Sequence, residues 1–250
     1  MRADVFLVEA GHAATRSQAQ RLIASGVEWR LTPLAPWKKV AKNGDEIPAG
    51  AELQLLDAAE AKYISRGGLK LEGALAATGL SVKGLRCLDV GQSTGGFTDC
   101  LLQAGARRVI GVEVGHDQLH PRLLADPRVV QFEGINARHL TPELIAPALE
   151  GPLDLIVGDV SFISLTLVLP RLAELLPQGG RLLFLVKPQF EVGPGNIGRG
   201  GIVRDPALYH EVEHKLRDCA KMLGLTIRAW LDSPITGGDG NREFFIWLNK

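Results

Sequence analysis

From about residue 67 to the C-terminus, short apolar runs alternate with longer segments of helical periodicity. The runs of strand length lie at 86–90, 109–114, 129–133, 153–157, 182–186, 226–231 and 244–248. The predicted helices lie at 69–78, 97–104, 118–125, 164–176 and 206–223. This alternation predicts an α/β fold, in which a seven-stranded, mostly parallel sheet has helices on both faces. The last two strands have no helix between them, so we expect them to pair antiparallel.

The N-terminal part has a different pattern. We expect residues 1–60 to form a small α+β domain, joined by a connector at 61–66 to the large domain at 67–250. A chain of 250 residues is long enough for both domains. Apolar spacing in the small domain predicts a short helix around 5–8 and a second helix from about 15 to 26.

The net charge of zero hides an uneven distribution of charge along the chain. Residues 1–42 contain seven Lys or Arg and three acidic residues, whereas residues 43–60 contain five acidic residues and no basic one. A small domain with one basic face fits a nucleic-acid partner, and a normally solvated surface is the alternative.

Composition disfavours several classes of protein. Hydrophobic residues make up 46% of the chain and charged residues 22%, as in ordinary globular proteins. The longest apolar run, at 182–186, has the length of a core strand, and the N-terminus lacks the apolar stretch of a secretory signal. The three cysteines are scattered without CxxC spacing. We therefore expect free thiols in a reducing, cytoplasmic compartment, with no metal site and no membrane partner.

A glycine-rich segment, DVGQSTGGFT at 89–98, follows the first strand of the large domain. In sheets of this kind, ligands bind at the carboxyl ends of strands where the strand order reverses, and glycines let the backbone approach the ligand. The GxxxGG spacing differs from the GxGxxG of dinucleotide-dependent dehydrogenases. Glu113 ends the next strand, where a carboxylate typically accepts both hydroxyls of a ribose, and Asn136 follows the third strand. Together these features resemble the S-adenosylmethionine site of class I methyltransferases.

The segment after the fourth strand of the large domain narrows the choice of methyl acceptor. Methyltransferases that act on exocyclic base amines tend to have an Asn/Asp-Pro-Pro-aromatic turn there, whereas this chain has DVSF at 159–162. Enzymes that methylate cytosine carbon usually have a Pro-Cys pair, and none of the three cysteines here follows a proline. Oxygen is therefore the best acceptor.

Four polar residues far apart in the chain form a candidate catalytic set: Lys70, Asp159, Lys187 and Glu243. They lie in the short segments SRGGLK at 65–70, GDVSF at 158–162, VKPQFE at 186–191 and NREF at 241–244. Two lysines and two carboxylates near such a cofactor are suited to deprotonating and orienting a hydroxyl that attacks a methyl group.

In these motifs the chain resembles the TlyA, or haemolysin A, family of ribosomal RNA ribose methyltransferases, whose catalytic domain is similar to that of the FtsJ-like 2′-O-methyltransferases. The resemblance extends over essentially the whole chain. Its motifs in the connector and large domain lie at 63–71, 89–99, 159–165 and 187–191. The patterns at 2–8 and 16–26 resemble the RNA-binding domain first described in ribosomal small-subunit protein four.

The resemblance implies an S-adenosylmethionine-dependent enzyme that methylates the ribose 2′-hydroxyl of a cytidine in ribosomal RNA, with ribosomal subunits as its partners. It implies that the tetrad is catalytic, and we assign Lys187 as the base nearest the hydroxyl. The implied cofactor-binding residues are Asp89, Gly91, Ser93, Thr94, Gly95, Gly96, Phe97, Glu113, Asn136 and Asp159. The implied RNA-binding residues are Arg2, Arg16, Arg21 and Arg66. No oligomer is predicted.

The chain departs from the family pattern at two places. Gln92 stands where the family usually has a small residue, and its side chain is large enough to crowd the cofactor. Residues 27–31 lack the usual Val-Asn-Gly turn of the small domain.

We expect the glycine-rich loop at 193–201 to order on binding RNA or cofactor. A membrane-active haemolysin, a dehydrogenase and a non-catalytic RNA-binding assembly factor are the alternative functions.

Overall fold

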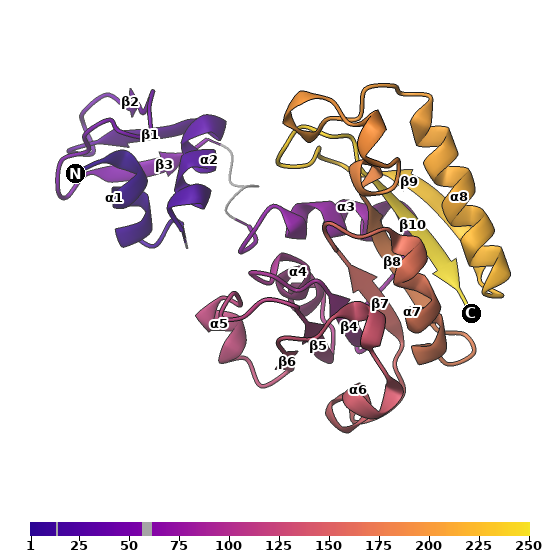
Figure 1. Ribbon diagram of the computed structural model, residues 1–250. Coiled ribbons are helices and arrows are strands. Elements are labelled where there is room, and N and C mark those ends of the chain that lie inside the picture. Colours follow the sequence, from indigo (N-terminus) through magenta and orange to yellow (C-terminus); the bar gives the residue numbers. More distant parts are fainter. Residues whose placement is uncertain (14, 57–61) are drawn as a thin grey trace. The chain divides into compact units, whose positions relative to one another are not determined.

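In a computed structural model, the described residues are 1–13, 15–56 and 62–250. They separate into two compact units, Met1–Leu69 and Lys70–Lys250 (Figure 1). The predicted domain boundary at residue 60, and the first residue of the predicted connector, lie outside the described residues.

The small unit contains two helices and a three-stranded antiparallel sheet. Helix α1 spans Ala3–Glu9 and α2 spans Arg16–Gly26. The sheet order is β2 (Lys38–Lys39), β1 (Val27–Arg30), β3 (Glu52–Leu55). Helix α2 begins after Thr15, whose hydroxyl accepts a hydrogen bond of 3.2 Å from the Gln18 backbone N–H and so caps the helix. The predicted apolar face of α2 is buried in the core of this unit.

The large unit is built on one seven-stranded sheet in the order β6-β5-β4-β7-β8-β10-β9. The strands are β4 (Arg86–Val90), β5 (Arg108–Val112), β6 (Val129–Phe132), β7 (Leu155–Gly158), β8 (Arg181–Val186), β9 (Thr226–Asp232) and β10 (Phe244–Asn249). The strands from β4 to β8 pair in parallel, and β10 pairs antiparallel with both β8 and β9. The α/β fold class and the antiparallel pairing of the last two strands are therefore confirmed.

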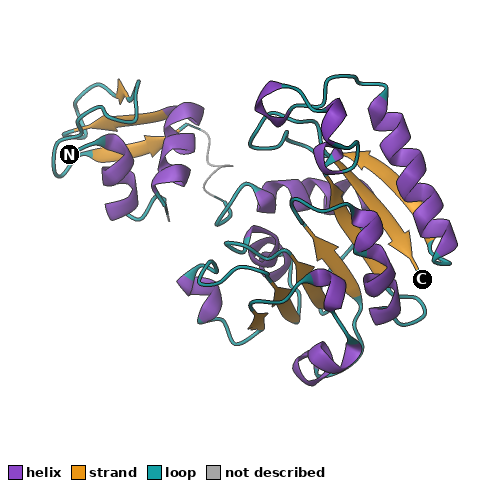
Figure 2. Cartoon of the chain, in the orientation of Figure 1, coloured by secondary structure: helices purple, strands orange, loops and turns teal. Residues whose placement is uncertain are grey.

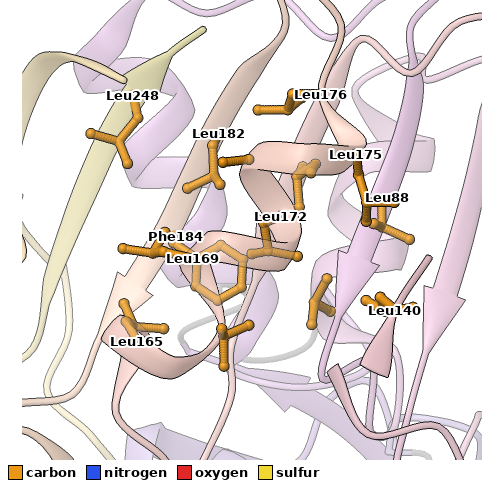
Figure 3. Close-up of a cluster of buried hydrophobic side chains, with 14 of the residues drawn as sticks. Leu88, Leu140, Leu165, Leu169, Leu172, Leu175, Leu176, Leu182, Phe184 and Leu248 are labelled. Atoms are coloured by element: carbon orange, nitrogen blue, oxygen red, sulfur yellow. The ribbon is translucent and has the colours of Figure 1, made fainter. Parts of the chain in front are cut away.

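Helices cover both faces of this sheet (Figure 2). On one face, α6 (Pro142–Leu149), α7 (Leu169–Leu175) and α8 (Leu208–Met222) bury apolar surfaces against the strands. Figure 3 shows the centre of this core, where Leu169 and Leu172 of α7 lie beside Leu182 and Phe184 of β8. Helix α4 (Gly96–Gln103) contacts β10, because the Phe97 ring stacks on the Phe245 ring with 6.2 Å between centroids.

Prolines account for the main differences from the predicted elements. The helix predicted at 164–176 is divided into a 3₁₀ turn, Leu165–Leu167, and α7, because Pro170 has no N–H to bond to the preceding turn. The helix predicted at 118–125 shortens to α5 (Pro121–Leu124). Helix α6 has no counterpart among the predicted elements, since Pro147 interrupts its helical pattern.

The strand order reverses at β4, because β5 pairs with one edge of β4 and β7 with the other. The segments that follow these three parallel strands therefore leave the same end of the sheet. In open α/β sheets this end, at the point of reversal, is where ligands bind. Helix α3 (Gly67–Thr78) precedes β4 and contains Lys70.

We predict that Gly158→Ala destabilises the large unit. Gly158 pairs with Phe184 across β7 and β8, and a Cβ at Gly158 would lie 2.1 Å from the buried Phe184 ring. Overpacking of this kind typically costs about 1–3 kcal/mol. Urea denaturation should show this loss, whereas the matched control Gly195→Ala, where a Cβ meets nothing within 4 Å, should be near neutral. Equal stability of the two variants would contradict the prediction.

Candidate functional site

A cavity of about 760 Å³ opens at the carboxyl end of the sheet. Five of the ten predicted cofactor residues line it: Gly91, Ser93, Glu113, Asn136 and Asp159. Apolar side chains from the segments after β5, β6 and β7 complete the wall. A pocket of this size, mostly apolar and with a few fixed polar groups, suits a nucleoside-sized ligand.

The Glu113 carboxylate is held in place at the end of β5. One oxygen accepts a hydrogen bond of 2.8 Å from the Ser93 backbone N–H, and the other accepts one of 2.9 Å from the Gly115 backbone N–H. Each carboxylate oxygen can accept a further hydrogen bond. The two oxygens can therefore receive a pair of hydroxyl groups from a ligand in the cavity.

Two glycines give the loop after β4 its shape. Gly91 has φ +80°, and a Cβ there would lie 2.7 Å from the Asp159 carbonyl oxygen. Gly95 has φ +98°, and a Cβ there would lie 2.2 Å from the Leu123 side chain. Both positions therefore require glycine, the first because two backbone segments approach closely at the cavity wall.

The other five predicted cofactor residues, Asp89, Thr94, Gly95, Gly96 and Phe97, lie outside the cavity lining within the part of the chain that the structure describes. Phe97 instead packs on Phe245, as noted above. Asp89 is fully buried at the carboxyl end of β4. These residues shape the loop from behind, and their contact with a ligand stays a prediction.

Gln92 is buried and lies outside the lining of this cavity among the described residues, contrary to the expectation that it crowds the cofactor. Its side chain is buried above β5, where a Cβ on Gly111 would lie 1.9 Å from it. Its amide donates a hydrogen bond of 2.9 Å to the Thr98 hydroxyl, which in turn donates one of 2.7 Å to Asp89. The absence of a side chain on Gly111 makes the room that the larger residue needs.

A second cavity of about 390 Å³ contains three members of the predicted tetrad, Lys70, Lys187 and Glu243, in its wall. The antiparallel pairing of β10 explains how they meet. Phe244, the first residue of β10, pairs with Val186, the last residue of β8. Glu243 and Lys187 each lie one residue beyond this pair, so the two motifs end at the same edge of the sheet.

The four tetrad residues form two ion pairs. Lys187 Nζ lies 2.5 Å from an Asp159 carboxylate oxygen and donates a hydrogen bond of 2.8 Å to the Ser161 hydroxyl. Lys70 Nζ donates a hydrogen bond of 2.6 Å to Glu243. The Lys187–Asp159 pair is partly exposed, whereas both members of the Lys70–Glu243 pair are buried.

The two ion pairs interact electrostatically, as the pKa of Glu243 indicates. Burial raises the pKa of its carboxyl above the ordinary value, and the Lys70 ammonium opposes that rise. The Asp159 carboxylate raises the same pKa further and the Lys187 ammonium lowers it. The four groups therefore form one charged cluster with two cations and two anions.

The two cavities meet at three residues that line both of them, Ser161, Phe162 and Phe190. The Phe162 and Phe190 rings lie 5.1 Å apart between centroids. Phe162 is 90% exposed and has φ +63°, a left-handed conformation that is unfavourable for a bulky residue. Sequence reasoning did not assign Ser161 or Phe162 a role, although both lie in the DVSF motif beside Asp159.

Glu191, the last residue of the VKPQFE motif, holds the segments after β7 and β8 together. Its carboxylate accepts hydrogen bonds of 2.6 Å from the Ser164 hydroxyl and 2.7 Å from the Leu165 backbone N–H. Lys215 of α8 donates another, of 2.8 Å. The partners are more than twenty residues away in the chain, so only the fold reveals this role.

Of the predicted RNA-binding residues, Arg2 and Arg16 are brought together by Asp4. Arg2 donates hydrogen bonds of 3.0 and 3.1 Å to the buried Asp4 carboxylate, and Arg16 donates one of 2.9 Å. These bonds hold the pKa of Asp4 well below its ordinary value. The two arginine side chains stay more than half exposed. Arg21 lies on the outer side of α2, where it donates to the Ser17 carbonyl.

Arg66 belongs to the small unit by its contacts, near the start of α3. None of the helices in the described ranges is long and apolar enough to cross a membrane.

Comparisons with known proteins identify one family that the chain resembles over nearly its whole length. The family described as FtsJ-like methyltransferase matches residues 63–250. The 16S/23S rRNA (cytidine-2'-O)-methyltransferase TlyA of Mycobacterium tuberculosis is 43% identical over 247 residues, which cover 99% of this chain and 89% of that protein. Hemolysin A of Brachyspira hyodysenteriae is 37% identical over 249 residues, covering 98% of each. A solved structure from Streptococcus thermophilus is 42% identical with a TM-score of 0.76, and the match covers 100% of this chain and 88% of that one.

Because the Asp89 carboxyl is buried, we predict that the stability of the protein depends on pH in a specific way. Burial raises its pKa from the ordinary 3.8 to about 7, although the Thr98 hydroxyl bond opposes the rise. An acid whose pKa is higher in the folded than in the unfolded protein stabilises the fold when the pH lies below its ordinary pKa. This stabilisation is lost as the pH rises through the folded-state pKa. We therefore expect the unfolding free energy of the wild type to fall, relative to Asp89→Asn, between pH 3.8 and about 7, and the difference to stay level above that.

Urea denaturation at stepped pH measures this difference. Asp218→Asn is a matched control, because Asp218 is largely exposed. A difference between wild type and Asp89→Asn that does not change with pH would contradict the assignment.

Proposed function

The chain belongs to the FtsJ-like methyltransferase family, and from this premise we propose that it transfers a methyl group from S-adenosylmethionine to the ribose 2′-hydroxyl of a cytidine in ribosomal RNA. The observation that supports this most is the junction of the two cavities, one suited to a nucleoside and the other lined by two lysines and two carboxylates. The 43% identity to a ribosomal RNA (cytidine-2'-O)-methyltransferase over nearly the whole chain supports the same acceptor.

The first cavity fits S-adenosylmethionine in size and in its polar groups. Glu113 would hold the ribose hydroxyls, and Asn136 would border the adenine. Asp159 would lie near the positive end of the cofactor, at the side of the cavity that leads to Ser161. When bound there, S-adenosylmethionine supplies an electrophilic methyl group attached to a sulfonium.

Lys187 would act on the attacking oxygen. After its ammonium has passed a proton to solvent, the Lys187 Nζ would take the proton of the 2′-hydroxyl as the oxygen bonds the methyl carbon, and the electron pair of the broken carbon–sulfur bond would stay on sulfur. Asp159 and the Ser161 hydroxyl, at 2.5 and 2.8 Å, fix Nζ at the junction of the cavities. This positioning keeps the oxygen in line with the methyl group.

Lys70 and Glu243 would provide a fixed charge rather than a mobile proton. Their hydrogen bond of 2.6 Å is buried, so neither group exchanges readily with solvent. The Lys70 ammonium stabilises negative charge that develops on the oxygen, and Glu243 balances it in the resting enzyme. This division assigns proton transfer to the partly exposed pair and electrostatic stabilisation to the buried pair.

The RNA would be held by both units. The 2′-hydroxyl distinguishes RNA from DNA at the acceptor cavity. Phe162, exposed at the junction of the cavities, offers a face on which the target base can stack. The residues 1–60 would bind RNA phosphates through Arg2, Arg16 and Arg21, with Arg66 adding a further contact. Action on ribosomal subunits would place the enzyme in the cytoplasm.

Lys187→Ala tests the proposed chemistry. We expect a loss of about 10²–10⁴ in the rate of methyl transfer, because a positioned base is removed. Cofactor binding should persist, since Lys187 lines the second cavity and not the first. The measurement is incorporation of labelled methyl from S-adenosylmethionine into unmodified ribosomal subunits, followed by analysis of the nucleosides.

The exposed Lys221, paired only at 3.8 Å with Asp218, provides the matched control as Lys221→Ala. Label in a ribose that is lost with Lys187→Ala and kept with Lys221→Ala would support the proposal. Label on a base, or label that Lys187→Ala leaves unchanged, would contradict it.

Phe162→Ala tests the proposed stacking of the target base. Loss of a stacking side chain is typically worth about 1–3 kcal/mol. We expect the KM for the RNA to rise by about tenfold or more, which is what about 1.4 kcal/mol corresponds to. Initial rates over a series of subunit concentrations measure this, with Phe132→Leu, a partly buried core change on β6, as a control. A KM equal to that of the wild type would exclude a stacking role.

A further inference from the structure

Asn241 is a buried polar residue in the NREF motif, and none of the roles above uses it. It is 1% exposed and lies outside both cavity linings among the residues that the structure describes. Its side-chain amide nitrogen donates hydrogen bonds of 2.9 Å to the Gly201 carbonyl and 2.8 Å to Asp239. Its side-chain oxygen accepts one of 3.0 Å from the Val203 backbone N–H.

These partners allow only one orientation of the amide. A carbonyl and an ionised carboxylate can only accept, and a backbone N–H can only donate. Burial raises the pKa of Asp239, but hydrogen bonds from Asn241 and the charge of Lys187 outweigh this effect, so the pKa lies below its ordinary value. Asp239 is therefore an acceptor at neutral pH, and an aspartate at position 241 could not reproduce the two donated bonds.

Asn241 connects three segments that form the wall of the second cavity. Gly201 lines the cavity from the glycine-rich loop, and Asp239 lines it from the segment before β10. Gln189, which also lines it, donates a hydrogen bond of 3.2 Å to Asp239 from the turn after Lys187. Glu243 follows Asn241 by two residues and completes the same wall.

Among the described residues, most hydrogen bonds of the loop at 193–203 stay within the loop or join it to an adjacent residue, and Asn241 is the partner from the segment before β10. The loop contains two 3₁₀ turns and a single bridge between Ile197 and Val203. Gly200 and Gly201 have left-handed φ values, and most of the loop is exposed. The two hydrogen bonds from the Asn241 side chain are thus a substantial part of what joins this loop to the sheet.

We propose that Asn241 is a positioning residue for methyl transfer. It holds Asp239 and residues 197–203 of the loop at 193–203 in place, and these form the wall of the acceptor cavity beside Lys187 and Glu243. It acts through these residues and does not touch the substrate. The inference rests on the proposed function for its substrate, a ribose in RNA, but its structural part concerns the loop alone. Release of the loop should therefore impair the acceptor cavity and leave the cofactor cavity intact.

Asn241→Asp is the sharpest variant, because it keeps the size of the side chain and removes both donated bonds. The matched control is Asn249→Asp, the same change at the other end of β10, where Asn249 pairs with Arg181 and Thr226. Three quantities are measured on the full chain: the Kd for S-adenosylmethionine, kcat and KM for methylation of ribosomal subunits, and the rate of trypsin cleavage after Arg199 and Arg204, both exposed in or next to the loop.

For Asn241→Asp we expect a cofactor Kd within about twofold of the wild type, a fall in kcat/KM of about a hundredfold, within the range for positioning effects, and faster cleavage at the two arginines. The control should match the wild type in all three. Unchanged kcat/KM, or cleavage at the wild-type rate, would overturn the proposal. Equal losses of cofactor binding and transfer would also overturn it, since they indicate a general structural role.

Asp239→Asn serves if the first variant fails to fold, because it keeps the shape and places a second amide against Asn241. The same pattern at reduced size is expected, and a wild-type cleavage rate would contradict the proposal. The trypsin readout also separates this inference from the function. If the wild type methylates no RNA, the proposed function fails, while the tether between Asn241 and the loop is still tested by cleavage.

Discussion

The buried ion pair between Lys70 and Glu243 is the interaction on which the rest of the site depends. Its two residues are 173 positions apart in the chain and are joined by a hydrogen bond of 2.6 Å. A buried charge without its partner typically costs about 3–5 kcal/mol, so the pair requires α3 and the start of β10 to meet at one place. The partly exposed Lys187–Asp159 pair lies beside it and shares its field. One pair is thereby suited to hold charge and the other to exchange a proton.

The topology of the sheet explains why four distant motifs converge. The parallel strands β4, β7 and β8 bring the glycine-rich segment at 89–98, Asp159 and Lys187 to one end of the sheet. A further parallel strand would end there too, but β10 runs the other way, so its first residue pairs with the last residue of β8. The antiparallel strand therefore brings Glu243 to this end without an extra crossover. Glu191 and Asn241 then hold the connecting segments in register around the two cavities.

Much of the fold, and the motifs that form the site, could be predicted from the sequence, because strand-length apolar runs and motif spacing depend on local sequence. Helix α6 was missed because Pro147 interrupts its periodicity, although Thr141 and Pro142 resemble a helix start. The direction of Gln92 could not be predicted, because it depends on the space above Gly111 on a neighbouring strand. The same holds for Asn241, whose partners Gly201 and Val203 are about forty residues away. Long-range hydrogen bonds of this kind leave no periodic signal in the sequence.

We infer that the cofactor and the target ribose meet beside Ser161, at the junction of the two cavities. A structure of the protein bound to S-adenosylhomocysteine and an unmodified ribosomal subunit tests it most directly. We expect the cofactor ribose to lie on Glu113 in the larger cavity and the target 2′-oxygen to lie within hydrogen-bonding distance of Lys187 Nζ. A target ribose bound away from Lys187, or a cofactor bound outside the larger cavity, would contradict it.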